Sequence, residues 1–332
     1  IGSGLVGSEM CIRDRCETGK ETDSMGWLSK WLEPKPYNCG YLPPKDGHEV
    51  FFMEFGNPQG LPVIVFHGGP GGGCSPKHAA IFNLKRYRVI LFDQRGCKRS
   101  LPLGELKNNT TQALLEDTTR LLNHLKIKDK VILRGGSWGS TLALLWAIQN
   151  PQRVERLLLS QIFLADKEAL RWENSEAAWF YPEFVEQLKN KSHGFDIPEY
   201  FDKLINGGEA EKQLEAANTY GFWERVRSSL NPRWNSAEEL SDCELAEQRI
   251  YIRYAARKFW LEDEEILGNL SKIKDIPAVI VHNRLDFVCP LKGAYEVHKA
   301  LPRSRLVVVP DSGHVSPLLY KTIKREFRKE LV

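Results

Sequence analysis

A glycine-flanked serine between a buried strand and a helix is the strongest constraint on how this chain folds. Residues 135–139 read Gly-Gly-Ser-Trp-Gly, after the apolar run at residues 130–133 and before the helix-forming run at residues 140–149. A serine on such a tight turn adopts strained backbone angles, so small residues must flank it, and its hydroxyl is pushed above the sheet edge. The N-terminus of the following helix favours negative charge there. The pattern therefore predicts a strand, a sharp turn and a helix, with Ser137 as a candidate nucleophile.

Short apolar runs alternate with helical segments from about residue 49 to residue 309. Near-continuous apolar, β-branched runs are typical of strands that are buried on both faces of a parallel sheet. We expect an α/β fold with a mostly parallel sheet flanked by helices, and with an antiparallel strand at residues 49–55 ahead of it. The parallel strands are expected at residues 62–66, 88–92, 130–133, 156–159, 278–281 and 306–309, and helices at residues 110–125, 140–149 and 292–300.

The strand pattern stops between residues 164 and 267, where the chain becomes helical, polar and aromatic. A length of 332 residues suits one large α/β domain with a smaller insertion. We therefore predict a core of residues 25–163 and 268–332, and a helical cap of residues 164–267. The tryptophans of this segment are expected to fill the core of the cap, because tryptophan is largely buried on average. They are Trp172, Trp179, Trp223, Trp234 and Trp260.

Residues 1–24 show no hydrophobic period and no apolar segment suited to a signal peptide. Part of this stretch, residues 4–15, resembles a translated sequencing-adapter fragment. We expect residues 1–24 to be a non-native or disordered tail, and the protein's own sequence to begin at Met25.

Composition excludes several classes of protein. The chain is 42% hydrophobic and 27% charged, which excludes wholesale disorder. Its net charge of +3 includes no basic block, so no nucleic-acid partner is expected. No apolar run approaches the roughly 20 residues of a membrane helix, so no membrane partner is expected. The seven cysteines are scattered without a Cys-x-x-Cys pair, which argues against disulfides and zinc and for a reducing, cytoplasmic compartment. The sequence carries no signal for the oligomeric state.

A serine hydroxyl is a poor nucleophile unless a base, held by an acid, activates it. After Ser137 the chain supplies Asp286, just beyond one late strand, and then His314, just beyond the last strand. The order serine, acid, histidine and the position at the carboxyl ends of strands both match a nucleophile of this type. We take Ser137 as nucleophile, Asp286 as acid and His314 as base. His282 also follows a strand, but it precedes the acid.

Residues 67–73 read His-Gly-Gly-Pro-Gly-Gly-Gly and follow the first parallel strand. Such a loop exposes backbone N–H groups beside the nucleophile, and we expect an oxyanion hole from the N–H groups of Gly69 and Trp138. A phosphate loop is the alternative, but the Gly-Lys-Ser/Thr ending is missing. Residues 93–100 read as a polar connection whose charges hold the loops beneath the site.

Together these motifs resemble the proline iminopeptidase family of α/β-hydrolases over about residues 41–314. The resemblance is carried by residues 67–71, 93–97, 135–140 and 286–290. It implies the α/β-hydrolase fold and the release of an N-terminal residue, preferably proline, from peptides, with no metal or organic cofactor. It also implies that Ser137, Asp286 and His314 are the catalytic residues.

The resemblance implies a cap that reads the free amine of the substrate with carboxylates, because a buried ammonium group needs a paired negative charge. Glu224 matches the first amine-binding glutamate of the family, and Cys289 would lie near the substrate pocket. Tyr251 stands where the family has a second acid, with Glu247 or Glu244 as possible replacements. The substrate-binding candidates are therefore Glu224, Tyr251 and Cys289.

The function predicted from the sequence is that of a serine aminopeptidase that releases proline or another small residue through an acyl-enzyme. Because the specificity pocket departs from the family pattern, an esterase or amidase that acts on small acyl compounds is the alternative. A binding protein without activity fits less well, since the nucleophile, acid and base are all present. The expected partner is a peptide or a small acyl substrate.

Overall fold

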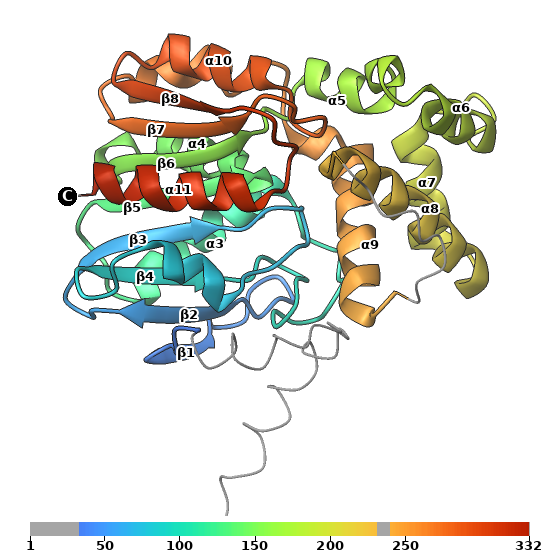
Figure 1. The fold of residues 1–332 in the computed structure, drawn as a ribbon. Coiled ribbons are helices and arrows are strands. Elements are labelled where there is room, and N and C mark those ends of the chain that lie inside the picture. Colours follow the sequence, from blue (N-terminus) through green and yellow to red (C-terminus); the bar gives the residue numbers. More distant parts are fainter. Residues whose placement is uncertain (1–32, 231–239, 332) are drawn as a thin grey trace, which may run out of the picture.

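The computed structural model describes residues 33–230 and 240–331, and its centre is an eight-stranded sheet (Figure 1). The strand order is β1-β2-β4-β3-β5-β6-β7-β8. β2 pairs antiparallel with β1 and β4, and every other pair is parallel. The predicted parallel sheet and its antiparallel first strand are confirmed, and β1 is an addition. The strands are β1 (Asn38–Tyr41), β2 (Phe51–Gly56), β3 (Leu61–Phe66), β4 (Tyr87–Phe92), β5 (Val131–Ser137), β6 (Val154–Ile162), β7 (Ala278–Asn283) and β8 (Ser304–Val309).

Successive side chains of the inner strands pack into two separate cores, one on each face of the sheet. Val63 of β3 belongs to one core and its neighbour Ile64 to the other. Both faces are covered by helices, which explains why these strands are apolar at almost every position. One face carries η1 (Pro76–Ile81) and α11 (Pro317–Glu330), and the other carries α3 (Thr111–His124), α4 (Trp138–Gln149) and α10 (Leu291–Ala300).

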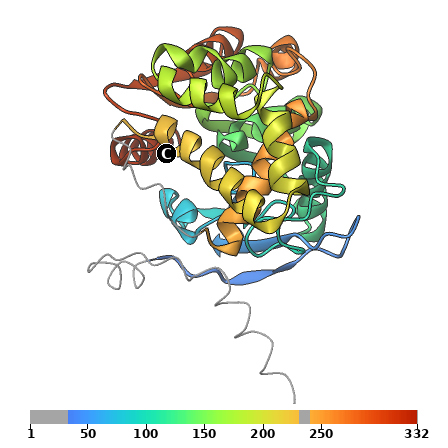
Figure 2. The same ribbon diagram turned by 90° about the vertical axis from the view of Figure 1, so that its right-hand side faces the viewer.

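The chain between β6 and β7 forms helices over the edge where the parallel strands end (Figures 1 and 2). We call the helices from α5 to α9 the cap. α7 packs against both α8 and α9. The domain boundaries at residues 163/164 and 267/268 stay a prediction. The elements of this segment are α5 (Lys167–Asn174), η3 (Glu176–Trp179), α6 (Pro182–Lys191), α7 (Ile197–Gly207), α8 (Ala210–Ser228), α9 (Asp242–Ala256), η4 (Lys258–Trp260) and η5 (Leu267–Ile273), and η2 (Pro151–Arg153) precedes β6.

The tryptophans of the cap segment do not all fill its core. Trp223 is 1% exposed, and Trp172 and Trp260 are partly buried against the same core. Trp179 is 86% exposed, so the prediction was wrong for this residue. Its position in η3, at the outer rim of the cap, leaves its ring in solvent. Trp234 and residues 1–24 lie outside the described residues. In the ranges that the structure covers, no helix is both long and apolar enough to cross a membrane.

Candidate active site

Ser137 lies at the turn between β5 and α4, with φ 55° and ψ −132°. This conformation costs roughly 1–3 kcal/mol for a residue other than glycine. A Cβ atom at Gly135 would lie 2.1 Å from the carbonyl oxygen of Gly139, and one at Gly139 would lie 2.2 Å from that of Phe66. Both positions therefore require glycine. The Ser140 hydroxyl donates to the Ser137 carbonyl at 2.7 Å, and the Ser137 side chain makes no capping bond to the helix. The turn thus holds Ser137 at the end of the central strand with its hydroxyl available.

Asp286 and His314 come from the loops after β7 and β8 and form a buried pair. His314 Nδ1 lies 2.9 Å from Asp286 Oδ2 and 3.0 Å from Oδ1. Asp286 Oδ1 also accepts the N–H groups of Val288 at 3.0 Å and Cys289 at 2.8 Å. Burial opposes ionisation of Asp286, but His314 and these N–H groups outweigh it, so the pKa of Asp286 lies below its usual value. A carboxylate on Nδ1 leaves Nε2 of the imidazole to accept a proton.

Ser137 and His314 line one cavity of about 260 Å³, together with Gly68 and Gly69. A Cβ atom at Gly68 would lie 3.5 Å from Ser137 Cβ, so the glycine-rich loop runs directly beside the serine. The N–H of Trp138 belongs to the first turn of α4, where N–H groups have no partner within the helix. The structure therefore brings Ser137, His314 and Gly69 together and begins α4 beside them.

His67 supports the glycine-rich loop from beneath. It is 4% exposed, its Nδ1 lies 2.8 Å from the Gly68 carbonyl, and its Nε2 accepts the N–H of Gln94 at 3.0 Å. Burial lowers the pKa of His67 to about 4, so the ring is neutral and donates from Nδ1. The Gln94 side chain donates to the His67 carbonyl at 3.1 Å and accepts from the Trp138 indole at 3.0 Å. Gln94 thus joins the loop to the start of α4.

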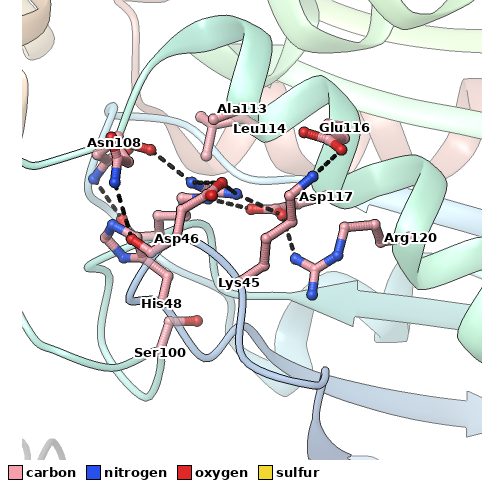
Figure 3. Close-up of polar contacts among 12 residues, drawn as sticks. Lys45, Asp46, His48, Ser100, Asn108, Ala113, Leu114, Glu116, Asp117 and Arg120 are labelled. Atoms are coloured by element: carbon pink, nitrogen blue, oxygen red, sulfur yellow. Dashed lines mark hydrogen bonds and ion pairs between the residues drawn. The ribbon is translucent and has the colours of Figure 1, made fainter.

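Arg95 centres an ion-pair network that fastens the neighbouring loops to α3. Figure 3 shows Asp46 and Asp117, the two acids of this network, with Arg120 beside Asp117. The fully buried guanidinium binds Asp117 through Nε at 2.6 Å and Nη2 at 3.0 Å, and it reaches Asp46 at 3.3 Å. Asp117 also accepts from Arg120 at 2.7 Å. Buried pairs of this kind favour one arrangement of the segments that they join. The charges of residues 93–100 therefore hold loops, as the sequence suggested.

His282 joins β6 to the loop that carries Asp286. It is fully buried; its Nδ1 accepts the N–H of Ile162 at 3.1 Å, and its Nε2 lies 2.8 Å from the carbonyl oxygen of Cys289. Burial lowers the pKa of His282, so its ring is neutral. Both ring nitrogens are engaged by the backbone, which leaves none to serve as a base.

Cys289 lies against the serine. Its side chain is 2% exposed, and Ser137 is among the groups that influence the pKa of its thiol. Burial, with the charge of Asp286, raises the pKa of the Cys289 thiol well above its usual range, so the group is a neutral thiol. The charges of Arg227 and Glu173 also act on this thiol, which brings the cap within electrostatic reach of the core site.

The cap holds a cluster of acids, phenols and one arginine, and the sequence did not reveal its central member. Glu173 of α5 is 4% exposed, and its Oε1 accepts from Tyr251 at 2.7 Å, Arg227 at 2.8 Å and Tyr220 at 3.2 Å. Tyr251, at the position of the expected second acid, therefore donates to an acid from another helix. In sequence, Glu173 has no feature that distinguishes it from a solvated acid on a helix face. We call Glu173, Tyr220, Glu224, Arg227 and Tyr251 the cap cluster.

Glu224 keeps some exposed surface and accepts from the Gln248 amide at 2.9 Å. Burial raises the pKa of Glu224 to about 8; the bond from Gln248 opposes this, and the charges of Glu173 and Glu247 add to it. Without a bound cation this carboxyl is therefore mostly protonated at neutral pH.

The two possible replacements for the second acid lie in different places. Glu247 packs on the glycine-rich loop, where a Cβ atom at Gly71 would lie 2.9 Å from Glu247 Cα, and burial raises the pKa of Glu247. Glu244 is exposed and accepts the N–H of Ser241 at 2.8 Å as a helix cap. Glu247 thus reaches the core site, and Glu244 does not.

The cap contacts each loop that carries part of the site. The Trp172 indole donates to the Phe287 carbonyl, next to Asp286, at 2.9 Å. The Val315 N–H, next to His314, donates to the Ser228 carbonyl of α8 at 3.0 Å. With Glu247 on the glycine-rich loop, the position of the cap is tied to all three loops.

Comparisons with known proteins agree with this architecture. The sequence profile of the alpha/beta hydrolase fold matches residues 62–319. The chain is 39% identical over 287 residues to a probable proline iminopeptidase of Leptolyngbya boryana, covering 84% of this chain and 89% of that one. It is 37% identical over 315 residues to a proline iminopeptidase of Arabidopsis thaliana, covering 92% and 83%. A proline iminopeptidase-related protein from Thermus thermophilus shares the fold, with a TM-score of 0.56, 24% identity and coverage of 89% and 96%.

Proposed function

The chain belongs to the proline iminopeptidase family of α/β-hydrolases, and on this basis we propose that it is a serine aminopeptidase that releases an N-terminal proline or another small residue from peptides. The observation that carries the proposal is the acid-rich cap cluster, of which Glu173 and Arg227 lie within electrostatic reach of the Cys289 thiol. An ammonium group loses its hydration when it is buried, so it binds only where a negative charge compensates it. Carboxyl groups in the cap therefore favour substrates with a free amine.

In the proposed reaction, Ser137 Oγ attacks the carbonyl carbon of the N-terminal residue while His314 Nε2 takes its proton. Asp286 orients the imidazole and stabilises its charged form. The N–H groups of Gly69 and Trp138 stabilise the oxyanion. His314 then gives the proton to the departing amine, which leaves an acyl ester on Ser137. Water attacks this ester, its proton passes through His314 back to Ser137, and the amino acid is released.

The proposed role of the cap is to bind the substrate amine through Glu224. Because an adjacent ammonium favours the charged form of a carboxyl group, substrate binding would lower the pKa of Glu224 and release a proton. Tyr251 and Arg227 orient Glu173, whose charge acts on both Glu224 and the Cys289 thiol. Selection for a free amine and the hydrolytic reaction would thus depend on different sets of residues.

The test compares prolyl, alanyl and N-acetylprolyl arylamides with a short p-nitrophenyl ester, with Ser137→Ala as the inactive control. We expect a free-amine arylamide to be the best arylamide substrate, acetylation to abolish its turnover, and Ser137→Ala to remove all activity. Turnover of N-acetylprolyl arylamide at the rate of the free amine would contradict the proposal.

One observation favours an esterase or amidase as the second candidate. Arg227 and two phenols already satisfy one oxygen of Glu173, which leaves this acid less able to bind a substrate cation. This alternative predicts that a substrate without a free amine is hydrolysed faster than its amine-bearing counterpart. The same set of substrates separates the two functions.

We further propose a reducing compartment, the cytoplasm, and a substrate of the peptide class. In the described part of the chain, Cys74, Cys97 and Cys289 are buried free thiols. Cell fractionation with an antibody against the protein tests the compartment, and recovery from an oxidising compartment would contradict it.

A further inference from the structure

Arg134, three residues before Ser137, has a buried donor that the fold leaves without a partner. Its Nη1 atom is buried and makes no hydrogen bond to the residues that the structure describes. Nη2 donates to the Ser160 hydroxyl at 3.0 Å, and the guanidinium lies over the ring of Phe327, 5.2 Å from its centroid. Burial lowers the pKa of Arg134 to about 10, so the group is still charged at neutral pH. No described carboxylate forms an ion pair with it, and a buried charge of this kind requires an anion.

This guanidinium lines the same cavity as Ser137, His314 and Gly69. Nη1 comes within 3.2 Å of where a Cβ atom at Gly136 would stand. Gly136 directly precedes Ser137, and consecutive Cα atoms are about 3.8 Å apart. The unpartnered donor therefore lies beside the residue that precedes the nucleophile.

The residues that line the cavity supply no negative charge. None of them is an aspartate or a glutamate. Burial lowers the pKa values of His67 and His78, which also line it, to about 4, so both rings are neutral. The cavity thus holds a positive charge with no carboxylate in its lining, whereas Arg227 of the cap cluster is paired with Glu173. An uncompensated positive charge in a cavity attracts an anionic group of a ligand.

We propose that Arg134 binds the C-terminal carboxylate of the leaving amino acid, so that dipeptides with a free C-terminus are the preferred substrates. The inference rests on the proposed aminopeptidase function and specifies its substrate class. In a dipeptide, only the nitrogen and Cα of the second residue separate the scissile carbon from the carboxylate carbon, a distance of roughly 4 Å. Each further residue moves the carboxylate away by up to about 3.3–3.6 Å. Arginine pairs with carboxylates through short, charge-assisted hydrogen bonds, and Nη1 supplies the free donor.

A chain of hydrogen bonds connects Arg134 to the backbone of His314. Ser160 Oγ, which accepts from Arg134, donates to Gln161 Oε1 at 2.7 Å. The Gln161 amide donates to the His314 carbonyl at 2.8 Å. Ser160 is therefore a positioning residue: Ser160→Ala keeps the positive charge of Arg134 and removes the hydroxyl that joins Arg134 to Gln161.

The experiment compares kcat/KM for prolylglycine, prolylglycinamide and prolylglycylglycine in wild type, Arg134→Met, Arg134→Lys and Ser160→Ala. We expect wild type to prefer the dipeptide over its amide by about tenfold or more, and over the tripeptide as well. Arg134→Met should reduce the dipeptide-to-amide ratio to about one, with intermediate ratios for Arg134→Lys and Ser160→Ala. A wild-type ratio near one, or an unchanged ratio in Arg134→Met, would overturn the proposal.

Two further measurements distinguish failure of the proposed aminopeptidase function from failure of the proposed role of Arg134. If wild type cleaves prolyl arylamide and prolylglycinamide but shows no preference for a free carboxylate, the aminopeptidase function stands and the role of Arg134 does not. If no prolyl substrate is cleaved, both fail. Labelling of Ser137 by a fluorophosphonate probe reports whether each variant is folded.

Wild type alone provides a test should Arg134→Met not fold. Leucine, a leaving-group product, should inhibit prolyl arylamide turnover at least tenfold more strongly than leucinamide does. Equal inhibition by the two overturns the proposal. Inhibition by acetate or chloride as strong as that by leucine also overturns it, because the cavity would then be a site for small anions.

Discussion

Charged side chains are paired differently in the loops at the sheet edge and in the cap above them. At the sheet edge, Asp286 is paired with His314 and two backbone N–H groups, and Arg95 is paired with two aspartates. In the cap, Glu224 has a neutral amide as its partner and Glu173 is paired with the buried Arg227. The charged groups at the sheet edge thus have charged or N–H partners within the core, whereas Glu224 in the cap forms no ion pair with a described residue and is mostly protonated at neutral pH.

This comparison predicts that substitutions in the core affect every substrate and that substitutions in the cap affect amine-bearing substrates. The cap contacts the loops beside Asp286, His314 and Gly71. Substitutions at these three contacts should affect amine-bearing substrates and other substrates together.

Asp286→Asn should reduce kcat about 10⁴-fold for both the prolyl arylamide and the p-nitrophenyl ester. The amide leaves the shape intact but no longer holds the imidazole in the tautomer that accepts the proton of the serine. Steady-state kinetics with both substrates measure the effect. Asp311→Asn, an exposed change near the loop of His314, is the matched control and should behave as wild type. A loss confined to one substrate would contradict the separation of core from cap.

Arg227→Met should lower the free energy of unfolding by about 3–5 kcal/mol, because Glu173 is left as an uncompensated buried charge. Urea unfolding measures the change. The double variant Glu173→Gln/Arg227→Met should recover most of the loss, since both charges are then absent. Arg225→Met, exposed on the same helix, is the control with little expected change. A double variant no more stable than Arg227→Met would show that the pair is not the source of the effect.

Glu224→Gln should lower kcat/KM for the prolyl arylamide by about 10–150-fold, the equivalent of roughly 1.5–3 kcal/mol for a charged hydrogen bond. Ester hydrolysis should change less than about twofold, because it requires no ammonium site. Glu211→Gln, exposed at the start of α8, is the control. Equal losses for both substrates would place Glu224 in the structural support of the site instead.

The pH dependence should separate the two substrates as well. Glu224, with a pKa of about 8, is protonated below that pH and cannot then neutralise an ammonium. The value of kcat/KM for the arylamide should therefore rise up to about tenfold per pH unit toward pH 8, because this constant reports the free enzyme. The ester profile should lack this rise, and Glu224→Gln should remove it from the arylamide. A rise that persists in Glu224→Gln would assign the titration to another group.

Trp172→Phe should destabilise the protein by about 1 kcal/mol and change arylamide turnover only a few-fold. The substitution removes one hydrogen bond, from the indole to the Phe287 carbonyl, and keeps an aromatic ring. Thermal unfolding and arylamide kinetics measure it. Trp179→Phe, in the exposed rim of the cap, should leave both unchanged. If arylamide turnover falls by much more than a few-fold while stability falls by only about 1 kcal/mol, this contact positions the loop that carries Asp286.

The core was predictable because its constraints are local. The turn at Ser137 admits only glycine at two neighbouring positions, and the parallel strands are buried on both faces, so both appear as short patterns in the sequence. The positions of Asp286 and His314 after late strands follow from the same topology, since parallel strands end at one edge. The catalytic roles of these residues stay a prediction for the kinetic tests above.

The side-chain contacts within the cap could not be predicted from the sequence, because they join residues far apart in the chain. Glu173, Arg227 and Tyr251 lie on three helices, and each by itself reads as an ordinary residue of a polar helix face. Trp179 shows the converse, since a residue type that is usually buried lies in solvent. Whether a helix face is buried depends on which other element packs against it. Composition and hydrophobic periodicity do not identify that partner.

The sequence by itself therefore determined the α/β-hydrolase core and the order of the residues proposed to carry out the reaction, because backbone sterics and strand topology act over short segments. Which charged side chains become buried, and which partners they find there, depends on the tertiary structure. It paired Glu173 with Arg227, left Glu224 without a cation, and enclosed the Arg134 guanidinium beside Ser137 without an acid. Desolvation depends on the whole packed surroundings of a group, so the properties that select a substrate emerge only in the folded protein.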